Sequence, residues 1–196
     1  MPDLPNGDAA NPQPLSAVRD ELRDADWLLW RGGGGIGIVG RSRYRHASKI
    51  AWWDGEPWVL EMLQFRGGQA VPLSKYVSRY PGRIDVYRTN EGDRWPEYDR
   101  AGSVRVMKGF VGEPYGWRAI WNASKLHIFG LRLFYRVDMN DLHTGDKNAY
   151  CSMAGVIADR IGGGVDQVPH LADYLTEPGE IARSPFNEYF CTLVGE

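Results

Sequence analysis

The feature that most restricts what this chain can fold into is a hairpin signal in "RYRHASKIAWWDGEPWVLEMLQF". Two runs rich in Val, Ile, Trp and Phe flank Asp54-Gly55, the dipeptide that favours a two-residue turn between antiparallel strands. Such a turn pairs Trp53 with Glu56. Further strand-like runs are Ala70–Leu73 and Ile84–Thr89. The first half of the chain is therefore predicted to form an antiparallel sheet.

A glycine-rich run precedes the hairpin. Gly35, Gly37 and Gly40 spell G-x-G-x-x-G after the apolar, strand-like run Trp27–Arg31. This fingerprint marks a dinucleotide site only inside a strand–turn–helix unit, with an acidic residue about 20 positions further on to hold the ribose. Here the glycines lead into a hairpin, and Asp54 falls in its turn. We therefore reject a dinucleotide site and expect a mobile loop over residues 32–40.

Two helices with an inward-facing stripe are predicted in the second half. In the first, the apolar positions that recur every three or four residues are Tyr98, Ala101, Val104, Met107 and Val111. The segment "GEPYGW" ends this helix. In the second, "NAYCSMAGVIADRIGGG", the stripe consists of Cys151, Ala154, Ala158 and Ile161, and Gly162–Gly164 form a stop signal. Cys151 is therefore expected at the first turn of a helix, on its inward side.

A thiol at the start of a helix has unusual chemistry. Unpaired N–H groups and the helix dipole stabilise a thiolate and lower the cysteine pKa. The same N–H groups can receive the oxyanion of a tetrahedral intermediate. The alternative is that Cys151 is a small buried apolar residue, as most free cysteines are. Cys191, in "YFCTLVGE", has no such setting.

A nucleophilic thiol needs a base, and His46 is the candidate because it lies mid-strand in the hairpin. With a turn at Asp54-Gly55, His46 falls opposite Leu63. Glu61 is then its diagonal neighbour on the same face, within reach of the imidazole. A register slip of one residue would send Glu61 to the opposite face. The spacing therefore permits a Cys151–His46–Glu61 triad.

The remaining histidines suggest no site. His127 and His170 have no neighbours in sequence that suggest ligation. His143 lies in the acidic segment "DMNDLHTGD", which lacks the Gly and the closing Glu of a calcium loop and is read as a solvated loop. No metal and no cofactor are expected.

Composition limits the domain organisation and the partners. The 196 residues, 43% apolar and 24% charged, fit one soluble domain with a core. We expect a flexible tail over residues 1–13, a short helix at Leu15–Arg23 with Ser16 as a possible N-cap, and a single domain over 14–196. A net charge of −2 gives no sign of the excess Lys and Arg that phosphate contacts need, so no nucleic-acid partner is expected. The oligomeric state is left open.

The expected location is the cytoplasm. No apolar run approaches the roughly 20 residues that a membrane span needs, and the first residues lack the pattern of a secretory signal. Two cysteines are too few for a disulfide framework, so both are expected as free thiols. Delivery to the cell envelope by another route, such as a phage holin or virion, stays open.

The order of the motifs resembles a known family. It runs through "DWLLWRG", a glycine loop, "YRHASKIAWWDG", "WVLEML", "AVPLSKYV", "IDVYR", "GEPYGW", "AYCS" and "TEPGEIARSP". This is similar to the circularly permuted papain-like cysteine amidases and peptidases of the YiiX/YaeF type, relatives of NlpC-type cell-wall peptidases. The resemblance implies an α+β fold, with a mostly antiparallel sheet packed against the helix that bears the nucleophile.

The resemblance also implies roles for particular residues. Cys151 would be the nucleophile, His46 the base and Glu61 the group that orients the imidazole. Tyr150 and the N–H groups of Cys151 and Ser152 would be candidates for the oxyanion site. The implied reaction is hydrolysis of an amide or related acyl bond through a thioester, without a metal. Peptidoglycan stem peptide is the leading substrate candidate.

Two departures from the family pattern lie near these residues. Met153 stands where the family often has an acidic residue, and Arg45-His46 replaces the usual Ser-His. Two other functions stay open: a lipid acyltransferase or thioesterase of the lecithin:retinol acyltransferase type, and a non-catalytic binding protein on the same fold. An apolar cleft would favour the former, and a reactive thiol without an acyl product the latter.

Overall fold

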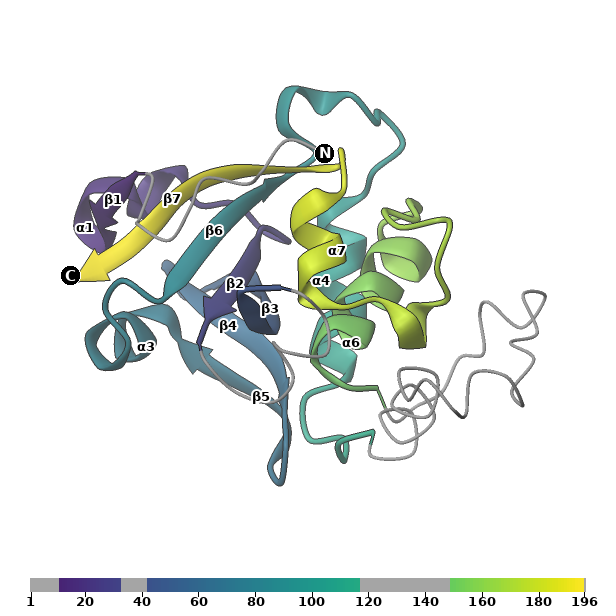
Figure 1. Ribbon diagram of the computed structural model, residues 1–196, viewed down its shortest axis with the longest axis horizontal. Helices are drawn as coiled ribbons and strands as arrows, with labels where there is room; N and C mark the ends of the chain where they lie inside the picture. Colours follow the sequence, from purple (N-terminus) through teal and green to yellow (C-terminus); the bar gives the residue numbers. More distant parts are fainter. Residues whose placement is uncertain (1–10, 33–41, 117–148, 196) are drawn as a thin grey trace.

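The computed structural model describes residues 11–32, 42–116 and 149–195. They form an α+β fold around one seven-stranded sheet with the order β1-β7-β6-β2-β3-β4-β5 (Figure 1). The strands are β1 (Pro12–Pro14), β2 (Trp27–Arg31), β3 (Tyr44–Trp53), β4 (Glu56–Leu63), β5 (Gly67–Pro72), β6 (Ile84–Thr89) and β7 (Asn187–Gly195). β1 runs parallel to β7, and the other neighbouring strands are antiparallel. The expected α+β class with a mostly antiparallel sheet is confirmed.

Helices pack on both faces of the sheet. They are α1 (Leu15–Val18), α3 (Leu73–Arg79), α4 (Arg100–Gly109), α6 (Cys151–Ile157) and α7 (Pro178–Arg183), with short 3-10 turns η1 (Arg19–Glu21), η2 (Glu91–Asp93) and η4 (Asp173–Leu175) and a π turn η3 (Ala158–Gly162). Figure 1 shows α4, α6 and α7 gathered on one side of the strands, away from α1 and α3. One apolar core lies under α1 and α3, and two others lie under α4, α6 and α7.

The hairpin forms as predicted. Trp53 pairs with Glu56, and the turn residues Asp54 and Gly55 have φ values of 51° and 77°. Two left-handed residues in succession are what the favoured two-residue turn requires. The prediction of strand Ile84–Thr89 is confirmed to the residue as β6.

The strand predicted at Ala70–Leu73 differs in its limits. β5 begins at Gly67, and Leu73 is the first residue of α3. A Cβ at Gly68 would lie 1.8 Å from the carbonyl oxygen of Phe110, so a close approach of two backbones requires this glycine. At the other end Pro72, with φ of −52°, leads directly into the helix. Neither the close approach at Gly68 nor the helix start after Pro72 can be recognised from local β propensity.

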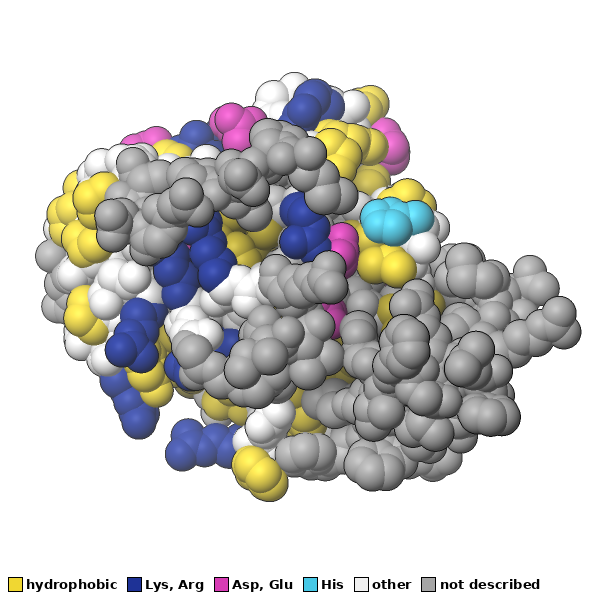
Figure 2. Space-filling model, viewed as in Figure 1, with side chains coloured by type: hydrophobic (Ala, Val, Ile, Leu, Met, Phe, Trp, Pro, Cys, Tyr) yellow, Lys and Arg dark blue, Asp and Glu magenta, His cyan; other side chains and the backbone are white. Residues whose placement is uncertain are grey.

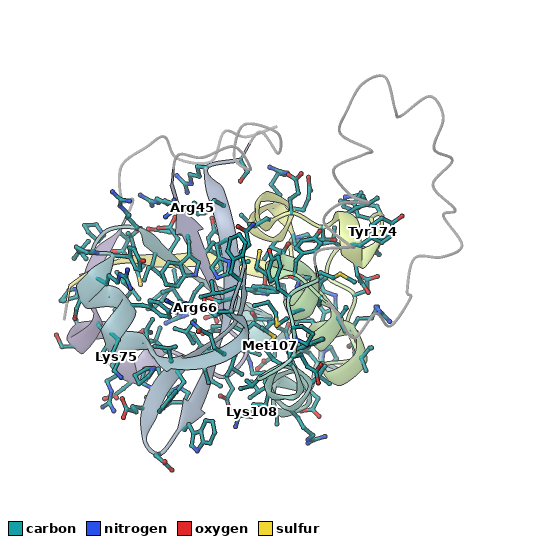
Figure 3. The ribbon with its side chains drawn as sticks, turned by 90° about the horizontal axis from the view of Figure 1, so that it is seen from below. Arg45, Arg66, Lys75, Met107, Lys108 and Tyr174 are labelled. Carbon is teal, nitrogen blue, oxygen red and sulfur yellow. The ribbon has the colours of Figure 1, made fainter. Side chains whose placement is uncertain are left out.

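The second predicted helix begins at Cys151 as expected, whereas α4 begins at Arg100, after Tyr98 of its predicted stripe. Both stripes end early. α4 ends at Gly109, so Val111 lies beyond it and is exposed. In the second helix α6 changes into the π turn η3, which alters the angle between successive side chains. Ile161 is therefore exposed rather than part of the inward stripe. Met107 of α4, labelled in Figure 3, faces the core. Nζ of its neighbour Lys108 lies 5.0 Å from the centre of the Trp53 ring.

Residues 11–13, expected as part of a flexible tail, are paired with the sheet. Pro12 pairs with Thr192 in β1, and the Asn11 side chain donates a hydrogen bond of 2.9 Å to the carbonyl of Phe190. The free edge of β7 explains this order, since it offers backbone partners to residues that propensity alone leaves unstructured. Ser16 is not the N-cap either, because α1 begins at Leu15 and Pro14 takes that position.

Two predicted segments lie outside the described residues: most of the glycine loop and the acidic loop around His143. In the described part of the chain, no helix combines the length and apolar character that a membrane span requires.

Figure 2 shows Lys and Arg side chains gathered over the strand side of the molecule. Arg31 of β2 and Arg43, just before β3, face the buried carboxylate of Asp85, at 2.7 and 3.7 Å.

Candidate active site

Cys151 is the first residue of α6, as the sequence predicts. Tyr150 precedes it in an extended conformation, so the backbone turns sharply into the helix at this point. Every residue of α6 is buried, because the helix is enclosed by the sheet, α4 and the turns that follow it. The Cys151 residue is only 8% exposed. The thiol therefore lies at a fixed place between helix and sheet.

His46 and Glu61 lie side by side, one on each strand of the hairpin. The Nε2 atom of His46 is 2.7 Å from Oε2 of Glu61. The pairing of β3 with β4 covers Lys49–Trp53, and both residues lie just beyond it. Their closeness follows the predicted register, which places them diagonally on one face.

The second oxygen of Glu61 is also held. Its Oε1 accepts hydrogen bonds from Nε2 of Gln69, at 2.8 Å, and from the hydroxyl of Tyr76. Gln69 comes from β5 and Tyr76 from α3, so two further elements fix the carboxylate. The Trp30 ring packs against both Tyr76 and His46, with ring centroids 4.9 and 5.8 Å away. The imidazole is thus oriented by a carboxylate that cannot rotate away.

These contacts keep Glu61 ionised. Burial alone raises the pKa of its carboxyl group, but the hydrogen bond and charge of His46, together with the donors Tyr76 and Gln69, lower it below the usual value of 4.5. A buried carboxylate next to the ring in turn favours the protonated imidazole.

Cys151 and His46 form a second link. Burial lowers the pKa of His46, but hydrogen bonds to Cys151 and Glu61 and the charges of both raise it to about 10. Burial raises the pKa of the Cys151 thiol, but His46 and the backbone N–H groups of Ala47 and Ser152 outweigh it and lower that pKa. The arrangement favours a thiolate beside an imidazolium ion. Since Glu61 occupies Nε2, Nδ1 is the ring nitrogen left for the thiol.

The residues on either side of Cys151 make different contacts: Tyr150 uses its side chain, and Ser152 uses its backbone. The Tyr150 hydroxyl donates a hydrogen bond of 2.7 Å to the carbonyl of Tyr174, a residue of η4 labelled in Figure 3. Its donor is therefore already engaged with the chain. The Ser152 side chain is fully buried, and its contribution to the thiol comes from its backbone N–H.

Tyr115 and Gln64 are site residues that the sequence analysis did not identify. The hydroxyl oxygen of Tyr115 accepts hydrogen bonds from the backbone N–H of Cys151 and from the Gln64 side chain, and it lies near the thiol. Burial, followed by the charge of Cys151, raises the pKa of Tyr115, so the phenol stays neutral. In sequence, Tyr115 falls in "GEPYGW", which was interpreted only as a helix stop and a family motif. No spacing rule connects it with a cysteine 36 positions later.

The second cysteine and the remaining histidines, for which the sequence suggests no site, lie away from this centre or outside the described residues. Cys191 is fully buried in β7, and burial raises the pKa of its thiol to about 12. His170 is exposed, and His127 and His143 fall outside the described residues. Among residues 11–32, 42–116 and 149–195, no three His, Cys, Asp or Glu side chains come together as a metal ion requires.

Comparisons with known proteins give a distant structural likeness. No protein family and no curated protein matches the sequence. Among solved structures, the fold is similar to that of the metalloprotein YiiX from Escherichia coli O157:H7, with 15% sequence identity and a TM-score of 0.49. The superposition covers 87% of this chain and 89% of that chain.

Proposed function

We propose that this chain is a cysteine hydrolase with a circularly permuted papain-like fold, and that it cleaves an amide or related acyl bond through a thioester. The observation that carries the proposal is the linked series of Cys151, His46 and Glu61. In it, the pKa of the thiol is lowered and that of the imidazole is raised. A nucleophile, a base within hydrogen-bond reach and a group that orients the base are what nucleophilic catalysis requires.

The first step is attack by the thiolate. The sulfur of Cys151 forms a bond to the carbonyl carbon of the substrate, whose oxygen becomes negatively charged. His46, protonated on Nδ1, then donates that proton to the leaving nitrogen as the C–N bond breaks. Glu61 holds the ring in place and stabilises its positive charge throughout.

The oxyanion would be received at Tyr115 and the backbone N–H of Cys151. In the unliganded site these two groups are hydrogen-bonded to one another, and Gln64 donates to the same hydroxyl. A substrate oxygen that displaces this contact would meet two donors, the backbone N–H of Cys151 and the hydroxyl of Tyr115. A phenol that stays neutral over the physiological pH range is suited to this role.

Hydrolysis of the thioester completes the cycle. A water molecule attacks the acyl carbon while the neutral His46 takes one of its protons. The C–S bond breaks, the acid product leaves, and Cys151 and His46 return to the thiolate–imidazolium state. Neither a metal nor a cofactor takes part in this scheme.

We propose peptidoglycan stem peptide as the first substrate to test. The reason is the resemblance of "YRHASKIAWWDG", "WVLEML" and "AYCS" to the NlpC-related enzymes. Release of a free amine from purified muropeptides is the readout. Transfer of an acyl chain from a lipid, without release of amine from muropeptides, would instead indicate the acyltransferase chemistry of the same fold.

Alkylation by iodoacetamide tests the thiolate without any substrate. We expect fast labelling of Cys151 at pH 6 in the wild type and a loss of about tenfold or more in His46→Ala, since the thiol pKa then returns toward its ordinary value of 9.0. The rate is measured from pH 5 to 9, and the labelled residue is identified by mass spectrometry.

Cys191 is the internal control, because it is fully buried and its pKa is raised to about 12. It should stay unlabelled in both proteins while the fold is intact. An ordinary thiol profile for Cys151 in the wild type, unchanged by His46→Ala, would refute the proposed chemistry and leave a binding protein.

A further inference from the structure

A buried ion pair joins the strand of His46 to the helix of Cys151. Lys49 lies three residues after His46 on β3, and Asp159 lies eight residues after Cys151 in the π turn η3 that continues α6. Nζ of Lys49 is 2.9 Å from Oδ1 of Asp159, and neither side chain is exposed. Strand β3 and helix α6, which carry His46 and Cys151, are thus also joined by this ion pair.

Lys49 is held on the sheet side of this pair by two further groups. Its ammonium group donates a hydrogen bond of 2.8 Å to the carbonyl of Ala25 and lies 4.2 Å from the ring centre of Trp27. Trp27 also supports α6 directly, because a Cβ placed on Gly155 would lie only 2.1 Å from its ring. The helical segment therefore rests on the sheet at two places, with Gly155 on Trp27 and Asp159 on Lys49.

Asp159 is held on the helical side. Its Oδ1 accepts hydrogen bonds from the Tyr98 hydroxyl at 2.6 Å and from the Ser103 hydroxyl at 2.7 Å. Its Oδ2 accepts one of 2.7 Å from the side-chain amide of Gln167. The carboxylate is therefore fixed by α4, by the segment before it and by the segment after η3, as well as by Lys49.

Such a pair does more for geometry than for stability. Apolar side chains of similar volume generally stabilise a core as well as a buried ion pair does, but they pack without a preferred direction. A hydrogen-bonded charge pair is directional. The other charged groups that act on Lys49 are Asp26 and Arg100. Burial lowers the Lys49 pKa, and the carboxylates of Asp159 and Asp26 oppose this effect.

We infer that the Lys49–Asp159 pair is a positioning pair, which holds α6 against β3 so that the thiol of Cys151 meets the ring of His46. The thiol accepts hydrogen bonds from His46 and from the backbone N–H of Ala47, both on β3. A small displacement of α6 along the strand would therefore break both contacts. This inference rests on the proposed cysteine chemistry.

Three variants test the pair. Lys49→Met removes the cation at similar volume, and the double variant Lys49→Met with Asp159→Asn removes both charges and keeps an oxygen acceptor for the neighbouring hydroxyl groups. Arg31→Met is the control, because it also removes the nearer cation from a fully buried carboxylate, that of Asp85, at 2.7 Å, while Arg43 remains 3.7 Å away. Arg31 lies on β2 and contacts neither Cys151 nor His46.

The readouts are the pH profile of Cys151 alkylation by iodoacetamide and the melting temperature. We expect Lys49→Met and Arg31→Met each to lower the melting temperature by roughly 10 °C. Only Lys49→Met should move the alkylation midpoint upward, by about one pH unit, with about tenfold slower labelling at pH 6. The double variant should regain most of the melting temperature but not the wild-type profile.

The outcomes separate the inference from the proposed function. A lowered midpoint in the wild type that persists in both the single and the double variant overturns the positioning role and leaves the thiolate chemistry intact. An equal shift in Arg31→Met also overturns it, since the effect would then follow from lost stability alone. A wild-type profile with an ordinary midpoint overturns both proposals together.

Discussion

Two tyrosines contact the start of α6, and their hydroxyl groups differ in what they do. That of Tyr150 donates to the carbonyl of Tyr174, whereas that of Tyr115 accepts from the backbone N–H of Cys151. The first ties the helix to η4. The second occupies the place where an oxyanion would be bound in the proposed reaction.

We expect Tyr115→Phe to lower kcat for the amide substrate by about 100-fold, as loss of one oxyanion donor typically does. Alkylation of Cys151 at pH 6 should change less than about threefold, because a neutral phenol adds little charge beside the thiol. Tyr150→Phe is the matched variant, with a lower melting temperature and a small change in kcat. The reverse pattern would assign the oxyanion to Tyr150, one of the first candidates from the sequence.

At the scale of the elements, the close packing of α6 against the sheet depends on a glycine. A Cβ at Gly155 would overlap the Trp27 ring, whereas one at Gly109, the last residue of α4, meets nothing within 4 Å. These two helical glycines therefore differ in packing and not in backbone conformation, since neither has a positive φ.

We expect Gly155→Ala to lower the free energy of unfolding by about 1–3 kcal/mol, because overpacking opposes the gain in helix propensity. The melting temperature should fall by roughly 5 °C. Gly109→Ala should leave it unchanged or raise it slightly. Equal stability of the two variants in thermal denaturation would show that α6 can shift on the sheet without cost.

The hairpin and its diagonal neighbours were predictable because one local signal determines them. Asp54-Gly55 specifies the turn, the turn specifies the register, and the register brings Glu61 to His46. The start of α6 at Cys151 was predictable in the same way, from the periodicity after it.

Contacts between distant segments were not predictable from local patterns. Gly68 is required by the backbone of Phe110, and β1 forms because β7 offers a free edge. Tyr115 reaches Cys151 from a segment that carries no periodicity at all. The fold class and the candidate triad therefore follow from sequence, whereas the oxyanion group and the ion pair at Lys49 emerge only from the packing.

At the scale of the whole molecule, the pair of Cys151 and His46 gives a specific dependence of stability on pH. In the folded protein this pair holds one proton, which lies on His46 because the pKa of the imidazole is raised, and the Cys151 thiol is deprotonated. Between the ordinary values of 6.5 and 9.0 the unfolded chain also holds one proton, on the thiol, so the two contributions to the pH slope cancel.

We therefore expect the stability difference between the wild type and the double variant Cys151→Ala with His46→Ala, which lacks both groups, to be greatest and nearly flat from about pH 6.5 to 9. Below this range the unfolded chain binds an additional proton, and the thiolate's contribution is lost as pH falls through its lowered pKa. Above it, the contribution of His46 is lost as pH rises through about 10. Urea denaturation of both proteins at a series of pH values measures this difference. A difference that rises steadily across the range would contradict a preformed ion pair.

The buried charge pair also has a consequence for evolution. Neither Lys49 nor Asp159 can be replaced alone without leaving the other as an uncompensated charge inside the protein. Mutations at the two positions are therefore epistatic, and a lineage that loses one charge is under selection to lose the other. In a collection of natural variants of this chain, positions 49 and 159 should change together, although 110 residues of sequence separate them.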